Sequence, residues 1–387
     1  MVDEKEMLKS LVKYDYSVVD ADDTVSKVVS VFEDTGKGAV LVREGDRIIG
    51  VIRDRDLMRG CVMVNPHETK VRNFVIKTGV LSEDDLSIEK VARRFVEDST
   101  PFVLVKTSEG YGAIDINDFL NAVKDEFENL KARDVMNPDV ITINERESVA
   151  KALATMRNHG IDRLVVVDDN HRVVGIVTGK DIIDRVIAPK RESRLGGGSG
   201  KADRSLSIMV ESVMSYPVVT AERLDPVPKI IDLMTEHNIS SVVIVKDMIP
   251  EGIVIKKDLL EILLKKRSSA ELQVQLITKD ITLDEFDRKA LMEDLERFMR
   301  KFKNFLGNAV LFVYVKRHKE NFRGLPLVHV RLKLTSDKGT FFVTGESWGV
   351  EYALNATLKK LERAVLQEKE LLLDQRMVKK FYEETIS

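Results

Sequence analysis

The sequence predicts an α+β protein, with four β-α-β-β-α modules in two pairs followed by a β-α-β-β-β-α two-layer domain. The first observation is a motif that occurs four times, in which a glycine is followed by apolar residues and, six positions on, by an aspartate. The aspartates are Asp56, Asp118, Asp181 and Asp258, and their separations of 62, 63 and 77 residues indicate a repeat. The second observation is that the period stops after Lys266, where a different order of strand and helix patterns begins.

The length and composition limit the classes of protein to consider. A chain of 387 residues is too long for one hydrophobic core and predicts several domains. A net charge of −3 and a pI near 6.2 argue against a globally basic nucleic-acid binder, although an average can conceal a local patch. The single cysteine, Cys61, excludes a disulfide framework. No run has the length of a membrane span and the start of the chain lacks the apolar core of a signal peptide, so we expect a cytoplasmic protein.

The third copy shows the elements of one module in order. Strand-like residues 140–143 precede a helical run at 149–159, and a β-rich run at 163–169 precedes the strand and helix that start at Gly175. The apolar period switches between helix and strand along this stretch. The fourth copy repeats the order over 218–264, the first follows it well, and the second keeps it with fewer signature residues.

These repeats resemble cystathionine-β-synthase (CBS) domains, β-α-β-β-α modules that work in pairs. The resemblance covers about residues 8–266 and implies one pair over 1–128 and a second over 129–268. The glycine-rich, charged stretch 190–206 accounts for the larger last spacing and is predicted to be a flexible loop inside the second pair. Its GGGSG run is either natural or an introduced linker.

Thr178 and Asp181 have the spacing of a capping box, in which both side chains bind free backbone amides at the start of a helix. Such amides can also bind phosphate, while a carboxylate can accept both ribose hydroxyls. Two interpretations of Thr178 and Asp181 therefore remain: a purely structural helix cap, and a nucleotide-binding site. Residues at these positions in CBS families bind adenosine nucleotides, so the resemblance implies AMP, ADP or ATP as a regulatory ligand. The nucleotide-binding residues that it implies are Thr142, Arg163, Gly175, Thr178, Asp181, Asp258 and Asp56.

The other copies depart from this pattern at the threonine position, which holds Arg53, Asp115 and Ile255 in turn. Arginine can hold a phosphate, aspartate would repel it, and isoleucine offers no polar group. Capping is expected to fail at Ile255 while Asp258 remains, which favours a ribose contact for Asp258. We therefore predict one good site in the second pair and a weaker one near Asp56.

The last third of the chain predicts strands and helices in the order β-α-β-β-β-α. One predicted strand, residues 327–334, alternates apolar side chains with His329, Arg331 and Lys333, so one face should be buried and the other polar. Two helices should therefore cover one face of the sheet. The predicted elements are 272–277, 283–305, 309–316, 327–334, 340–345 and 350–370.

The closing helix pattern, WGVEYALNATLKKLERAVLQEKE, together with the order of elements, resembles the ribosome hibernation-promoting factor family. The matching residues are Tyr352, Ala353, Leu358, Lys360, Leu361, Glu362 and Arg363. The resemblance covers 269–370 and leaves 371–387 as a C-terminal helical tail, while the segment ENFRGLPL is longer than the family pattern. It implies binding to the small ribosomal subunit and its rRNA at the decoding region, which silences translation.

Basic residues gather in this last third. The segment from Lys301 to Thr340 contains nine lysines and arginines and two acidic residues. The cluster is either a solvated basic face or a surface for the RNA phosphate backbone, since lysine and arginine contacts to phosphate carry no base information. The residues predicted to contact the ribosome are Arg297, Arg300, Lys303, Lys316, Arg317, Lys319, Arg323, Arg331, Lys333, Lys359, Lys360 and Arg363.

The sequence carries no enzyme signature. Its histidines form no HxxxH or HExxH pair and no serine lies in a GxSxG motif, so we expect no catalytic residue, no metal and no catalytic cofactor. Trp348 is interpreted as a packing residue rather than a stacking platform. Expected partners are the ribosome, an adenine nucleotide and a second copy through the CBS pairs, with no membrane and no DNA. The alternative function is an adenylate-sensing regulator of another enzyme or transporter, with the C-terminal domain as a protein-interaction module.

Overall fold

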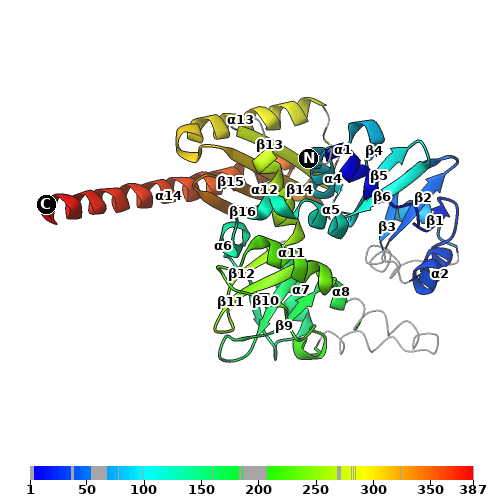
Figure 1. Cartoon of the computed structure of the whole chain (residues 1–387), viewed down its shortest axis with the longest axis horizontal. Coiled ribbons are helices and arrows are strands. Elements are labelled where there is room, and N and C mark those ends of the chain that lie inside the picture. The colour runs from blue at the N-terminus through cyan, green and yellow to red at the C-terminus, as the bar shows by residue number, and fades with distance from the viewer. Residues whose placement is uncertain are drawn as a thin grey trace. The chain divides into compact units, whose positions relative to one another are not determined.

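The computed structural model divides into two compact units, Met1–Leu264 and Lys265–Ser387. It describes residues 4–35, 39–53, 68–76, 78–98, 100–159, 161–182, 185, 207–267, 272–279, 281, 283, 285–322 and 324–386. Figure 1 shows the order of the elements along the chain. The mixed α+β class predicted from the sequence is confirmed.

The N-terminal unit contains four three-stranded sheets with one topology. In each sheet the first strand pairs parallel to the second, and the second pairs antiparallel to the third. A helix joins the first two strands of each sheet, as parallel pairing requires a crossover connection. The strands are β1 (Val18–Asp20), β2 (Ala39–Glu44), β3 (Arg47–Arg53), β4 (Val80–Ser82), β5 (Phe102–Thr107), β6 (Gly110–Asp115), β7 (Thr142–Asn144), β8 (Arg163–Val167), β9 (Val173–Thr178), β10 (Thr220–Ala221), β11 (Ser241–Lys246) and β12 (Ile249–Ile255).

Helices of the N-terminal unit cross over within a sheet, follow its third strand, or precede its first strand. The crossover helices have apolar faces that pack on the strands they connect, as in the core formed by Val149, Ala152 and Met156 with Leu164 and Val177. The helices are α1 (Glu4–Ser10), α2 (Val25–Thr35), α4 (Ile88–Asp98), α5 (Ile116–Ala122), α6 (Ala132–Val135), α7 (Val149–His159), α8 (Gly179–Ile182), α11 (Val227–Glu236) and α12 (Lys256–Arg267).

Neighbouring modules exchange backbone hydrogen bonds between the third strand of one and the segment that leads into the other. The Ser215 N–H donates to the Ile176 carbonyl at 2.8 Å, and the Ile176 N–H donates back at 3.1 Å. The same reciprocal exchange joins Asn137 to Ile253. Valines of β8 and β11 also share one hydrophobic core. Third and fourth modules are thus held together by contacts that do not involve the stretch between them.

That stretch, residues 190–206, lies outside the described residues. We expect deletion of residues 195–200 to leave the melting temperature within a few degrees of the parent, because the Ser215–Ile176 exchange does not depend on it. Thermal unfolding followed by circular dichroism checks this. In the control variant Ser215→Pro, loss of the N–H donor should lower the melting temperature. If limited proteolysis of the deletion variant releases the third and fourth modules as separate domains, the pairing is wrong.

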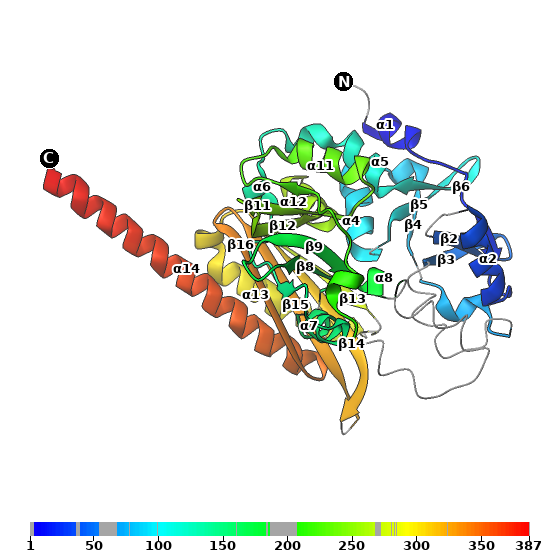
Figure 2. The same cartoon turned by 90° about the horizontal axis from the view of Figure 1, so that it is seen from below.

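The C-terminal unit is one four-stranded sheet with two helices on one face. The strand order is β13-β14-β15-β16, with β13 parallel to β14 and the other pairs antiparallel. Apolar residues of both helices pack on alternate residues of β14 and β15, including Leu311, Val330 and Leu332. The elements are β13 (Leu272–Lys279), α13 (Glu285–Leu306), β14 (Ala309–Phe322), β15 (Leu325–Ser336), β16 (Gly339–Trp348) and α14 (Val350–Ile386). Figure 2 gives a second view of α14, which continues well past the sheet.

Two predictions for this unit differ in detail from the structure. The closing helix, predicted to end near residue 370, and the predicted helical tail at 371–387 form one continuous helix, because α14 runs unbroken to Ile386. The segment ENFRGLPL was read as an insertion between strands, whereas most of it extends β14 and β15 into a longer hairpin. Phe322 pairs with Leu325 across its end, beyond a bulge between Arg317 and Asn321. The residues of this segment form strands because they pair with each other across the hairpin. The local hydrophobic pattern does not reveal such pairing.

The second face of the sheet is less polar than predicted. Val310 and Phe312 alternate with the core residues of β14, so they lie on this second face, and both are buried. Phe342 pairs with Lys333 on the same face. His329, Arg331 and Lys333 point away from the helices as expected but are only half-exposed. The sequence therefore predicted correctly which side chains of β15 point away from the helices. It predicted a more solvent-exposed second face than the structure has.

Candidate functional site

Thr178 and Asp181 form the predicted capping box at the start of α8. The Asp181 Oδ2 atom accepts the Thr178 backbone N–H at 2.8 Å and the Thr178 hydroxyl at 2.6 Å. The Asp181 N–H donates to the Thr178 Oγ1 atom at 3.1 Å. The other carboxylate oxygen, Oδ1, accepts the Ser215 hydroxyl at 3.1 Å. Both carboxylate oxygens of Asp181 therefore already accept hydrogen bonds from hydroxyl groups, and the two hydroxyls of a ribose would bind them in the same way.

Arg163 lies beside this cap. It pairs with Thr178 across β8 and β9, and its Nη1 atom donates to the Ser240 Oγ atom of the fourth module at 3.0 Å. Its Nε and Nη2 atoms bind the Asp162 carboxylate at 2.9 and 3.2 Å, which offsets part of its positive charge. Thr142 is exposed and pairs with Val165, a residue of the core shared by the two modules. The structure thus brings these predicted residues to one side of the third module, the side that faces the fourth.

Gly175 has a packing role that the sequence did not reveal. A Cβ atom on this glycine would lie 2.2 Å from the Met214 Sδ atom, far inside van der Waals contact. Gly252 meets Met136 in the same way, at 2.5 Å. The repeated glycine therefore leaves room for a methionine of the segment leading into the neighbouring module. No ligand contact is needed to explain it.

The fourth-module counterpart of the cap contradicts one prediction. Capping was expected to fail at Ile255, yet the Asp258 Oδ2 atom accepts the Ile255 N–H at 3.0 Å. The bond uses a backbone donor, so it survives loss of the threonine hydroxyl. Asp258 is also buried and its carboxylate binds a backbone amide, so failure of the cap no longer favours a ribose contact there.

Two further groups near this position bear on phosphate binding. Lys256 is buried, donates to the Asn117 side chain, and has its pKa lowered chiefly by burial. Asp115, at the threonine position of the second module, accepts the Asn117 N–H at 2.7 Å, and burial raises its pKa. A carboxylate at this position would repel a phosphate, and the expectation that the second module lacks a phosphate site stays a prediction.

Asp56 lies outside the described residues. Ser215 and Ser240, which contact Asp181 and Arg163, were missed by the sequence reasoning. Ser215 could have been found by comparing the repeats, because Val-Met-Ser at 213–215 corresponds to Val-Met-Asn at 135–137.

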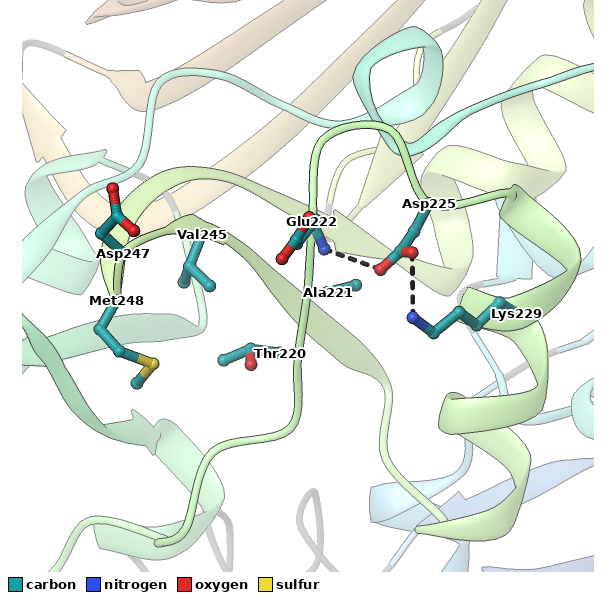
Figure 3. Close-up of a pocket in the computed structure, with 8 residues that line it drawn as sticks. All are labelled: Thr220, Ala221, Glu222, Asp225, Lys229, Val245, Asp247 and Met248. Atoms are coloured by element: carbon teal, nitrogen blue, oxygen red, sulfur yellow. Dashed lines mark hydrogen bonds and ion pairs between the residues drawn. The ribbon is translucent and has the colours of Figure 1, made fainter.

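A separate hollow opens at the fourth module (Figure 3). It contains three carboxylates, of which Asp225 accepts the Glu222 N–H at 2.8 Å and the Lys229 ammonium at 2.9 Å. Since the only cation in its lining is already paired, the hollow is a poor place for a phosphate group. Its lining is Thr220, Ala221, Glu222, Asp225, Lys229, Val245, Asp247 and Met248, which includes none of the predicted site residues.

The predicted ribosome-contacting cations fall on two sides of the C-terminal unit. One set, the helix-side cations, projects from the exposed faces of α13 and α14, away from the apolar core. These residues are Arg297, Arg300, Lys303, Lys359, Lys360 and Arg363. Lys301 of α13 binds Glu362 of α14, so the two helices lie against each other and their cations share one surface. Arg297 and Arg300 make exposed ion pairs within α13, which contribute little free energy and leave their charges accessible.

The other set, the sheet-side cations, is Lys316, Arg331 and Lys333 on the second face of the sheet. The Arg331 guanidinium lies 4.5 Å from the Tyr314 ring centroid and 5.7 Å from that of Phe342. This stacking holds Arg331 between two rings, so it is less available to solvent than the sequence suggested. Arg317 is exposed at the hairpin, Arg323 lies outside the described residues, and the side chain of Lys319 does too.

The described part of the chain has neither a membrane-spanning helix nor a cluster of metal-ligating side chains. No helix there combines the length and apolar composition needed to cross a bilayer. Within the same ranges, no three or more His, Cys, Asp or Glu side chains gather as a metal ion would require.

Comparison with known families identifies both parts of the chain. Residues 7–62, 132–188 and 210–265 match the CBS domain, and residues 273–384 match the C-terminal domain of hibernation factor Hib. The second module, β4 to α5, is not among the matched segments although its sheet has the same topology.

Similar proteins are found in Methanocaldococcus jannaschii. The uncharacterized protein MJ1404 is 28% identical over 277 residues, which cover 70% of this chain and 65% of that protein. The uncharacterized protein MJ1232 is 32% identical over 126 residues, or 31% of this chain and 40% of that protein. This chain thus spans less than two thirds of the length of either relative.

Among solved structures, protein MJ1225 of the same organism superimposes on 66% of this chain with a TM-score of 0.54 and 20% identity. The match covers 99% of that protein and shows a shared fold. The chain is therefore a fusion of CBS domains with a C-terminal domain of hibernation factor Hib.

Proposed function

We propose that this protein is a ribosome hibernation factor whose C-terminal unit binds the small ribosomal subunit and silences translation, under control of an adenine nucleotide bound by the CBS domains. The observation that carries the proposal is the match of residues 273–384 to the C-terminal domain of hibernation factor Hib, in the same unit that displays the exposed cations. The protein acts by binding and needs no catalytic step.

Charge supports RNA as the partner of the C-terminal unit. Residues 301–340 contain nine lysines and arginines against two acidic residues on a chain whose net charge is −3, so the positive charge is local to the C-terminal unit, where the helix-side cations are exposed. Lysine and arginine side chains on such a surface neutralise phosphates and release condensed counterions, which drives association at low salt. The surface recognises the shape of a folded RNA rather than its sequence.

The capping box supports nucleotide binding by the second pair. Asp181 presents two carboxylate oxygens that now accept hydroxyls of Thr178 and Ser215. Both partners are hydroxyl groups, so ribose hydroxyls can replace them without leaving the carboxylate unpaired. Ser215 belongs to the segment that leads into the fourth module, and its release would couple ligand binding to the contact between modules. The nucleotide would control the C-terminal unit by binding one of two conformations of the protein more tightly than the other, which shifts the protein toward that conformation.

Sedimentation with purified ribosomal subunits tests the proposal. We expect the protein to pellet with small subunits at about 0.1 M salt and to be released as salt rises, with a log–log slope of roughly −0.7 to −0.9 per phosphate contact. Adding AMP, ADP or ATP should shift the fraction bound. Protein that stays in the supernatant at low salt, with or without nucleotide, would contradict ribosome binding and favour a regulator of another enzyme or transporter.

A further inference from the structure

The end of the β14–β15 hairpin gathers apolar side chains that the core does not use. Phe322 is 52% exposed, Leu325 is 44% exposed and Tyr352 is 67% exposed. The Phe322 and Trp348 rings lie 5.6 Å apart with planes tilted by 38°. None of these residues belongs to the hydrophobic core of the unit. We call Phe322, Leu325, Trp348 and Tyr352 the aromatic tip.

The backbone holds the aromatic tip in place. Gly349 has a φ of +85°, a conformation that glycine adopts without strain, and its N–H donates to the Pro326 carbonyl at 2.8 Å. This bond ties the start of α14 to the hairpin. A Cβ on Gly349 would lie 3.7 Å from atoms of both Leu325 and Tyr352, so the two side chains flank the glycine. The rings are thus positioned before any partner binds, which reduces the entropic cost of binding.

Exposed cations lie beside the aromatic tip. Lys316 pairs with His329 and Arg317 pairs with Val328, while Trp348 pairs with the next residue of β15, Leu327. Both cations are exposed. Residues 316–323 of the sequence hold four lysines and arginines against one carboxylate, Glu320, and Glu346 lies opposite His329 in this register. Aromatic rings beside an excess of positive charge suit a single-stranded nucleic acid, because its bases stack on the rings and its negative phosphates bind the cations.

We propose that the aromatic tip stacks an unpaired RNA base, while Lys316, which lies on the same face of the sheet as Trp348, holds a neighbouring phosphate. The inference rests on the proposed function and names the RNA element recognised, an unpaired nucleotide in a loop or bulge. Trp348 was interpreted from the sequence as a packing residue, and in the structure it packs against the exposed ring of Phe322. Unpaired bases are what aromatic side chains bind in RNA, because paired bases are already stacked within the helix.

The test uses the full chain and a twelve-nucleotide adenosine RNA carrying a fluorescein label. Trp348 is the only tryptophan, so quenching of intrinsic fluorescence on titration reports stacking at the aromatic tip. Anisotropy of the labelled RNA gives the affinity. Phe322→Ala should weaken binding about tenfold, as expected for loss of one base–aromatic stack, while Phe322→Tyr should retain it. The control Leu371→Ala removes another exposed apolar side chain of the same unit and should change nothing.

Phe322→Leu distinguishes stacking from general apolar contact. Loss of affinity in this variant supports stacking, whereas unchanged affinity, or absence of tryptophan quenching, overturns the inference. Small-subunit sedimentation of Phe322→Ala separates the two proposals. If wild-type protein sediments and Phe322→Ala sediments equally well, the aromatic tip is not the RNA contact although ribosome binding stands. If wild-type protein does not sediment but the oligonucleotide quenches Trp348, the proposed function fails and the stacking site remains.

Discussion

Reversing three charges on α14, with Lys359→Glu, Lys360→Glu and Arg363→Glu, is expected to reduce small-subunit affinity at least 100-fold at about 0.1 M salt. All three side chains are exposed and lie opposite the core residues Leu354 and Leu361. Each substitution would remove a proposed phosphate contact and add a repelling charge, and losing several contacts changes affinity by orders of magnitude. Sedimentation across a salt series measures both the affinity and the slope.

The fold should survive these substitutions, since none of the three side chains is buried. Lys360 donates to the Thr344 carbonyl at 2.9 Å, an exposed bond whose loss should cost at most about 1 kcal/mol of stability. Circular dichroism and the melting temperature verify that the variant is folded. A folded variant that binds as well as wild type would exclude the α14 surface as the ribosome contact.

Two further variants locate the contact, and the first is matched to the α14 variant in charge. Lys151→Glu, Arg157→Glu and Arg172→Glu together produce the same change in net charge on the N-terminal unit, where the three side chains are exposed, and should leave affinity within about twofold. Lys316→Glu with Lys333→Glu reverses the sheet-side cations. A larger loss from this second variant than from the α14 variant would place the RNA on the second face of the sheet.

Asp181→Ala is expected to weaken adenine-nucleotide binding more than tenfold. A hydrogen bond to a charged group contributes roughly 1.5–3 kcal/mol, and ribose would lose both carboxylate acceptors at once. Isothermal titration calorimetry with AMP, ADP and ATP measures the affinity. Because Asp181 also caps α8, the substitution should lower stability by about 1 kcal/mol, and melting curves must be recorded alongside.

Asp225→Ala is the matched control for losing a carboxylate that accepts a backbone N–H. Asp225 accepts the N–H of the residue three positions earlier, Glu222, at 2.8 Å, just as Asp181 accepts that of Thr178. The control should lower stability by a similar amount and leave nucleotide affinity unchanged. Equal nucleotide affinity in Asp181→Ala and wild type would show that Asp181 is a helix cap alone.

The local elements could be predicted from the sequence because short-range patterns encode them. The period of glycine and aspartate marked the repeats, and the switch between helical and strand periodicity located helices such as α7 and α13 near their observed limits. The capping box at Thr178 and Asp181 was also predictable, since its partners are three residues apart and their spacing alone fixes the contact. Alternation along β15 correctly assigned Val330 and Leu332 to the core.

Contacts between distant residues could not be predicted in this way. Ser215 reaches Asp181 across 34 residues, and Met214 fills the space that Gly175 leaves, because the segment leading into one module lies on the third strand of its neighbour. Likewise, Phe322 and Trp348 meet because β14 and β15 pair further than their apolar pattern extends. The sequence by itself determined the repeats, the elements and the basic character of the C-terminal unit. Which cations share a surface, and which polar groups meet Asp181, was decided only by tertiary packing, because helix and strand periods specify a face but not the neighbour that it meets.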